Sequence, residues 1–239
     1  MDTEYSLRQL SFSGAVLVAG YLTVRVILPP NRTPADRAWR TDSLWFARST
    51  VLVNLAAAAM SLLILYHAAL AAAPAATRAR LLCPAGGDAQ RNPALFTWTP
   101  LTAAALLAIL VGAPLRMGAF GGLGESFTFG LTRPRGGLVT TGLYAHVQHP
   151  SYTGMGLVAA ACGAVFLRLD GGAAACLVPA RWWPLVREWS AAACAGAGLL
   201  AVQQMATRVR QEEAMLRELF GKEWEEWHAR TKRFVPGLF

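Results

Sequence analysis

Charged residues are scarce in this sequence. Lys and Arg contribute 22 of the 239 residues and Asp and Glu contribute 14, so 15% of the chain is charged. A soluble globular domain has about 25% charged residues. Hydrophobic residues reach 54%. This balance argues against one or two ordinary soluble domains and indicates a membrane protein.

Cysteine is also sparse, and its four copies show no pattern of a metal or disulfide site. Cys83, Cys162, Cys176 and Cys194 include no Cys-x-x-Cys pair, and Cys162 and Cys194 lie within apolar runs. We interpret all four as small hydrophobic residues. Neither a disulfide framework nor a zinc site is expected.

Three further signals are absent. The first ten residues hold Asp2 and Glu4 but only Arg8 as a basic residue. They lack the basic flank of a cleaved signal peptide, so the first apolar run is expected to be retained. No Gly-x-Gly-x-x-Gly follows a predicted strand, which argues against a dinucleotide site of the Rossmann type. The net charge is +8, but no soluble basic domain is left over to bind nucleic acid.

Five apolar runs alternate with polar links. A helix needs roughly 20 residues to cross the hydrocarbon core of a bilayer. The expected spans are Leu10 to Leu28, Leu44 to Ala73, Thr99 to Leu115, Tyr152 to Leu169 and about Trp189 to Met205. They predict an all-α membrane protein with about five transmembrane helices. The link from Pro74 to Pro100, with Gly86-Gly87, is expected to be an unstructured surface loop.

Basic residues are distributed unevenly over the links. With Arg25 assigned to the interface, fifteen of the 22 fall in the first link, the third link and the C-terminal tail. Because basic residues favour the cytosolic side, the C-terminus is expected to be cytosolic. The third link, with Arg116, Arg133 and Arg135, and the tail are separated by two spans. They should therefore emerge on the same face of the membrane.

The link before the fourth apolar run concentrates unusual residues. From Leu138 to Gly156 it holds two histidines, two tyrosines and three glycines. Pro150 restricts His149 to an extended conformation and can open the first turn of a helix. Ser151 and Tyr152 should therefore begin a helix whose free N–H groups face the loop. Such a helix end favours an anionic group.

A second charged segment follows the fifth apolar run. Arg208 and Glu212 lie one helical turn apart on one face, beside Glu213. On spacing alone Arg208 pairs with Glu212, and Glu213 could brace the loop. Further acidic residues beside Trp224 and Trp227 are typical of an amphipathic helix at the membrane interface.

Three motifs occur in a fixed order in the C-terminal half. They are Leu-Val-Thr-x-Gly-x-Tyr from Leu138, His-Pro-Ser-Tyr-x-Gly from His149, and Arg-x-x-x-Glu-Glu-x-x-Leu from Arg208 with a following Phe-Gly. Over residues 127–239 the chain resembles the isoprenylcysteine carboxyl methyltransferase family. These are integral-membrane enzymes that use S-adenosylmethionine.

The resemblance implies a function and a site. The enzyme would methylate the C-terminal carboxylate of a prenylated cysteine, in the endoplasmic reticulum membrane, with a cytosolic site. It would consist of N-terminal transmembrane helices (1–98) and a catalytic region (99–239) with three transmembrane helices and a cytosolic tail. Arg208 would hold the substrate carboxylate. The cofactor would be bound by Leu138, Val139, Tyr144, His149, Pro150, Ser151, Tyr152 and Glu212.

The chemistry fits a site without an obvious base or metal. A carboxylate is already a nucleophile at neutral pH, so the protein has to align the reactants and exclude water. The planar fork of Arg208 can bind a carboxylate bidentately. Tyr144 could flank the adenine or anchor the chain at the interface. The expected partners are the bilayer and a prenylated or other lipophilic carboxylate, with neither metal nor nucleic acid.

Two departures from the family pattern leave the substrate open. Gln148 stands where the family usually has arginine, and Gly136-Gly137 replaces a usual polar residue. The alternatives are methylation of another lipophilic acid or of a phospholipid amine, a sterol-type membrane reductase, and a non-enzymatic scaffold. His67 and His228 match no motif and are expected at interfaces. Arg133 and Arg135 are the next candidates for the carboxylate.

Overall fold

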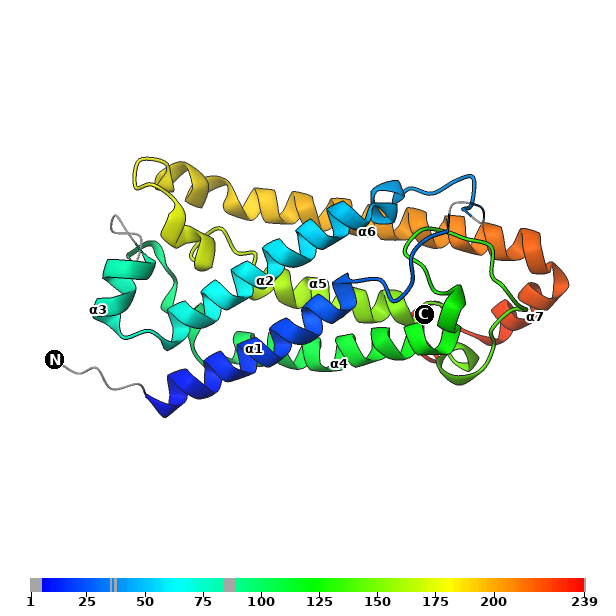
Figure 1. The fold of residues 1–239 in the computed structure, drawn as a ribbon, viewed down its shortest axis with the longest axis horizontal. Coiled ribbons are helices and arrows are strands. Elements are labelled where there is room, and N and C mark those ends of the chain that lie inside the picture. The colour runs from blue at the N-terminus through cyan, green and yellow to red at the C-terminus, as the bar shows by residue number, and fades with distance from the viewer. Residues whose placement is uncertain (1–5, 35, 37, 84–88, 239) are drawn as a thin grey trace. The chain divides into compact units, whose positions relative to one another are not determined.

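A computed structural model describes residues 6–34, 36, 38–83 and 89–238 (Figure 1). These residues form helices and turns, with isolated bridges but no strand. The expected all-α class is confirmed. The expectations for Asp2, Glu4 and Gly86-Gly87 fall outside the described residues. So does Arg37, one of the fifteen basic residues counted on the expected cytosolic side.

Within the described residues, four helices are long and apolar enough to cross a membrane. They are α1 (Leu7–Ile27), α2 (Thr50–Ala72), α4 (Pro100–Leu123) and α6 (Trp183–Phe220) (Figure 1). Large hydrophobic side chains are exposed along all four, as lipid contact requires. The fourth expected span forms α5 (Pro150–Val165), which has 16 residues. It is shorter than the roughly 20 residues of a full span.

Short helical elements connect the long helices. They are η2 (Trp45–Arg48), α3 (Ala75–Thr77), η3 (Arg78–Leu82), η5 (Pro93–Phe96), η6 (Gly124–Ser126), η7 (Gly142–Ala145), η8 (Ala173–Leu177) and α7 (Lys222–Arg230). The expectation of an unstructured loop between Pro74 and Pro100 is therefore wrong. Leu95 and Phe96 of that link are buried, because its apolar residues pack on the protein.

The chain forms two compact units. The first consists of Met1–Val24, Ala58–Leu110 and Leu157–Gly198, and the second of Arg25–Ala57, Val111–Gly156 and Leu199–Phe239. Both units draw on segments before and after residue 98. The expected catalytic region, 99–239, stays a prediction.

His67 belongs to the core of the first unit, so its expected interface position is wrong. Its ring stacks on Phe96 at 4.3 Å and meets Phe166 edge-on at 5.1 Å. Its Nε2–H donates to the carbonyl of Leu95 at 2.9 Å. His67 lies one helical turn from buried Ile64 and beside Ala68 on the inner face of α2. With its Nε2–H hydrogen-bonded to Leu95, the His67 ring packs among Phe96 and Phe166 as an aromatic residue would.

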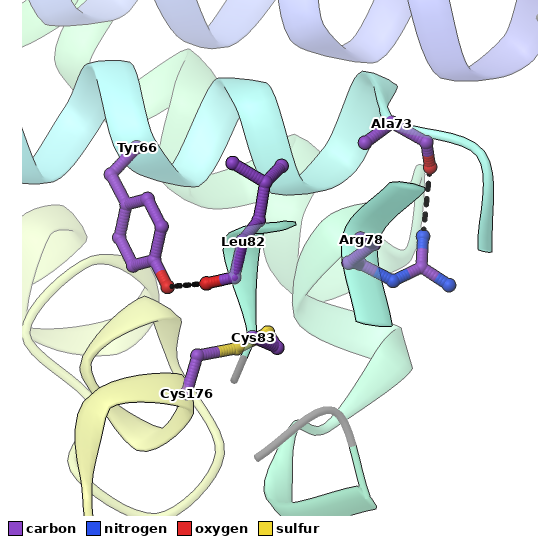
Figure 2. Close-up of a disulfide and its surroundings, with 6 residues drawn as sticks. All are labelled: Tyr66, Ala73, Arg78, Leu82, Cys83 and Cys176. Carbon is purple, nitrogen blue, oxygen red and sulfur yellow. Dashed lines mark hydrogen bonds between the residues drawn. A yellow bond between two sulfur atoms is a disulfide. The ribbon is translucent and has the colours of Figure 1, made fainter. Parts of the chain in front are cut away.

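A disulfide joins Cys83 and Cys176 in the first unit (Figure 2). The expectation that all four cysteines act as small hydrophobes is wrong for these two. They are 93 residues apart, so the pairing depends on tertiary structure, with Cα atoms 4.7 Å apart. Nearby, Tyr66 donates to Leu82 O at 2.5 Å, and Arg78 donates to Ala73 O at 3.0 Å beyond the end of α2.

The second unit joins the motif loop to the C-terminal tail. Helix α5 begins at Pro150, as the sequence predicts. Helix α6 ends at Phe220, where Gly221 takes a positive φ of 51° that favours glycine. The segment after α7 then lies along the motif loop: Gln148 N donates to Lys232 O at 2.8 Å and His149 N to Arg233 O at 2.9 Å.

Candidate functional site

A cavity of about 370 Å³ lies within the second unit. Its volume is in the range of about 300–1,000 Å³ that is usual for small-molecule sites. Eight of the nine predicted site residues line it: Leu138, Val139, Tyr144, His149, Ser151, Tyr152, Arg208 and Glu212. Pro150 does not line it and instead begins α5. The structure thus brings the motifs together, and the roles of their residues stay predictions.

Tyr152 connects the two charged residues of the third motif. Its hydroxyl donates to Glu212 Oε2 at 2.6 Å and accepts from Arg208 Nε at 3.2 Å. The expected i,i+4 pair is therefore bridged by a tyrosine of α5. This contact fixes α5 against α6 at the cavity.

Arg208 is buried, with 3% of its surface exposed, and already has an acidic partner. Its Nη1 forms an ion pair with Asp42, and its Nη2 donates to the carbonyl of Phe129 at 2.6 Å. Together with the bond to Tyr152, these contacts engage all three nitrogens of the guanidinium. A substrate carboxylate would have to share this group with Asp42.

Asp42 is a site residue that sequence reasoning missed. Its oxygens also accept from Arg48 Nε at 3.1 Å and from the backbone N–H groups of Leu44 and Leu131 at 3.0 Å each. Burial alone would raise the pKa of Asp42, but the charge of Arg208 and the hydrogen bonds from Leu131, Leu44 and Arg208 hold it below its ordinary value. No local pattern marks this residue, because its partner Arg208 lies 166 residues away.

Glu213 braces the loop, as the sequence suggested it could. It accepts from Arg233 Nε at 2.6 Å and Nη2 at 2.9 Å, and lies 3.4 Å from His149 Nε2. The hydrogen bond to Glu213 raises the pKa of Arg233. The ring of His149 stacks on Tyr152 at 5.4 Å. The tail thus helps to hold the cavity wall.

Gln148 points its amide at the tail. Its Nε2 donates to Thr231 Oγ1 at 3.0 Å and to His228 O at 3.2 Å, and its Oε1 accepts from His228 Nδ1 at 2.9 Å. His228 also stacks on Trp224 at 4.5 Å, and its expected position at a membrane interface stays a prediction. Gln148 lines the cavity, but its polar atoms bind the protein.

Helix α7 packs on the protein rather than on lipid, which corrects the expected interfacial helix. Trp224 and Trp227 form a buried cluster with Tyr144 and Ala119. Trp227 Nε1 donates to Tyr144 O at 2.8 Å, and the Tyr144 hydroxyl donates to Ala119 O at 3.2 Å. Burial raises the pKa of the Tyr144 hydroxyl. The apolar face of α7 is buried inside the unit because the motif loop covers it.

The start of α5 corrects another expectation. The N–H groups of Tyr152 and Thr153 donate to His149 O at 3.0 and 3.2 Å, so they are not free for an anion. Gly154 brings α5 close to α4, since a Cβ there would lie 2.4 Å from Gly112 O. This close approach places Ser151 beside Arg116.

Arg116 was assigned to the third link and instead lies inside α4, 2% exposed. Helix α4 continues through Pro114, which transmembrane helices tolerate. Arg116 lines the cavity, whereas the predicted alternatives Arg133 and Arg135 are exposed and do not. Arg135 pairs with Glu125, and Arg133 lies over the Trp39 ring at 5.5 Å.

One segment of the chain matches a known protein family. Residues 104–188, which include the motif loop and α5, match the profile of the isoprenylcysteine carboxyl methyltransferase (ICMT) family. Over this segment the chain is similar to the ICMT family. The similarity favours a membrane methyltransferase, in agreement with the four long apolar helices found among the described residues.

The family match ends before the third motif. The roles of Arg208 and Glu212 therefore rest on the motif and the geometry. Neither curated proteins nor solved structures gave a match. Among the described residues, no group of three or more His, Cys, Asp or Glu side chains could hold a metal ion.

Proposed function

We propose that the protein transfers a methyl group from S-adenosylmethionine to the carboxylate of a prenylated cysteine. The observation that carries this proposal is the cavity of the second unit. There, residues of three motifs from Leu138 to Glu212 line one space with a charged end and an apolar wall.

The residues of the cavity fit the cofactor. Glu212 Oε2 accepts from Tyr152, while its Oε1 has no hydrogen-bond partner among the described residues. A carboxylate oxygen of this kind suits the ammonium of a methionyl group. Tyr144 and Val139 supply apolar surface for the adenine. When bound, S-adenosylmethionine supplies a methyl group on a positively charged sulfur.

The apolar part of the lining fits a lipophilic acceptor. It includes residues of the first link, α2, α5 and α6: Leu44, Phe46, Leu52, Val53, Ala56, Met155 and Met205. With its lipid tail among these apolar residues, the acceptor would direct its carboxylate toward Arg208. The guanidinium has five N–H groups, of which three are engaged. The residues then act by alignment and by excluding water, with no proton to remove.

A second acceptor class, another lipophilic acid, is favoured by Gln148. An arginine at this position would add a charge to the cavity wall, whereas the Gln148 amide is bound to His228 and Thr231. The cavity therefore lacks one positive group for the acceptor's head. Acids with less polar heads than a cysteine derivative are the natural second set to assay.

We further propose that the site faces the cytosol, as the basic residues predict. Cys83 and Cys176 support this orientation. They lie in the second and fourth links, which the same rule assigns to the opposite side. Disulfides persist in oxidising compartments such as the endoplasmic reticulum lumen or the bacterial periplasm.

Titration calorimetry of the purified protein in detergent tests the cofactor. S-adenosylmethionine should bind and NADPH should not. Glu212→Gln and Tyr152→Phe each remove a polar contact worth about 1–3 kcal/mol, so each should weaken binding about 5- to 150-fold. Glu218→Gln, an exposed position on the same helix, is the control and should bind normally. Unchanged affinity in both site variants would place the cofactor elsewhere.

A further inference from the structure

The cavity is lined by two arginines, of which one has acidic partners and the other has none. Arg208 forms an ion pair with Asp42, and the Tyr152 hydroxyl links it to Glu212. Arg116 binds only neutral oxygens: its Nε donates to Val26 O at 3.1 Å, and its Nη1 donates to Ser151 Oγ at 2.7 Å and Ser151 O at 3.2 Å. Among the described residues no carboxylate pairs with Arg116.

One end of this buried guanidinium is not used. Its Nη2 has two N–H groups, and among the described residues neither has a hydrogen-bond partner. Arg116 is 2% exposed, yet it lines the cavity. A buried charge without a partner is costly, and natural structures usually pair it. The arrangement therefore leaves a place for an anion in the cavity.

Three aromatic rings surround the same guanidinium. The Cζ of Arg116 lies 5.0 Å from the ring centre of Phe120, 6.0 Å from Phe127 and 5.3 Å from Phe129. The rings stabilise the cation while excluding water from it. In such a low-dielectric setting an anion at Nη2 is attracted more strongly than at an exposed arginine.

We propose that Arg116 binds a carboxylate inside the cavity. The inference rests on the proposed function, which brings two carboxylates to this space: the methionyl carboxylate of the cofactor and the carboxylate of the acceptor. Arg116 is then the specificity-determining cation of the site. Arg208, whose charge Asp42 balances, still offers its two free N–H groups, so Arg116 acts beside Arg208 as a second cation of the site.

The test measures preference for carboxylates over uncharged counterparts. The pairs are S-adenosylmethionine with its decarboxylated form, S-farnesylcysteine with its methyl ester, and dodecanoate with methyl dodecanoate. Arg116→Gln removes the charge and keeps an amide that can reach Ser151. Arg116→Lys keeps the charge without the planar fork. Arg135→Gln removes an exposed arginine outside the cavity and is the control.

The wild type and Arg135→Gln should prefer the acid in at least one pair by about 10- to 150-fold, the usual contribution of a hydrogen bond to a charged group. Arg116→Gln should lose that preference, and Arg116→Lys should keep part of it. Loss in the first pair identifies the cofactor's carboxylate, and loss in the second identifies the acceptor's.

Two results would overturn the inference. One is a folded Arg116→Gln protein, checked by its thermal unfolding, that keeps every preference of the wild type. The other is a wild-type protein that prefers the acid in none of the three pairs. This result contradicts the inference even if Arg116→Gln does not fold. If the wild type binds no S-adenosylmethionine, the proposed function fails by itself. The dodecanoate pair then still decides whether Arg116 binds a carboxylate.

Discussion

Replacing Asp42 by Asn tests how the buried ion pair stabilises the second unit. The side chains of Arg208 and Asp42 are 4% and 2% exposed. Both oxygens of Asp42 act as acceptors, so an amide NH₂ would face either the N–H of Leu44 and Arg208 or the N–H of Leu131 and Arg48. The substitution leaves Arg208 buried without its counter-charge.

Breaking a buried pair in this way costs about 3–5 kcal/mol. For a chain of this size that corresponds to a decrease of roughly 6–20 °C in the unfolding temperature. Fluorescence-monitored unfolding in detergent measures it. The matched control is Glu218→Gln, whose pair with Arg40 is 52–73% exposed. An exposed pair contributes about 0–1 kcal/mol.

The pH dependence of unfolding provides a second test of the ion pair. The pKa of Asp42 is lowered in the folded protein, so its contribution is present above the unfolded pKa of about 3.9 and is lost as pH falls through the folded value. The wild type and Asp42→Asn should therefore differ at neutral pH, and this difference should begin to shrink only as the pH falls below about 4 toward the lowered folded pKa. If Asp42→Asn unfolds no earlier than Glu218→Gln at neutral pH, the pair does not stabilise the unit and the reasoning is refuted.

Three further predictions concern other parts of the chain. Replacing Cys83 and Cys176 by Ser should lower the free energy of unfolding by about 2–5 kcal/mol, and reductant should have the same effect on the wild type; a protein indifferent to both would contradict the disulfide. Gly154→Ala should reduce stability and cofactor binding because its Cβ would meet Gly112 O at 2.4 Å, whereas Gly156→Ala, with open space around it, should do neither. Gln148→Arg should loosen the tail and lower the unfolding temperature, since a buried amide that forms four hydrogen bonds with His228 and Thr231 is lost; a more stable variant would show that the tail does not depend on Gln148.

The sequence was most informative where a local rule decides the structure. Pro150 begins α5 because the first turn of a helix is where a residue without an N–H and with a fixed φ is favoured. The motifs around Tyr152 and Glu212 meet at one cavity, as their shared chemistry predicts. Apolar length predicted the bounds of α1 well. Helix α2 begins later than its apolar run, at Thr50, and α5 is shorter than its run, whereas α4 and α6 continue beyond theirs to Leu123 and Phe220.

The sequence was least informative where distant segments decide the structure. Asp42 and Arg208 pair across 166 residues, and Cys83 and Cys176 across 93. Arg116 resembled a basic residue of a link because Pro114 precedes it, yet α4 continues and buries its side chain. In each case the partner, rather than the local pattern, sets the environment of the side chain.

A methyl-transfer assay is the most direct test of the proposed carboxyl methylation. Purified protein in detergent is given S-adenosylmethionine with a labelled methyl group and S-farnesylcysteine, and the base-labile methyl ester is counted. The account predicts ester formation by the wild type and by Glu218→Gln, and its loss in Glu212→Gln, since that variant cannot hold the cofactor's ammonium. Robust binding of S-adenosylmethionine without ester formation on any lipophilic acid would contradict carboxyl methylation, and equal ester formation by Glu212→Gln would contradict the site.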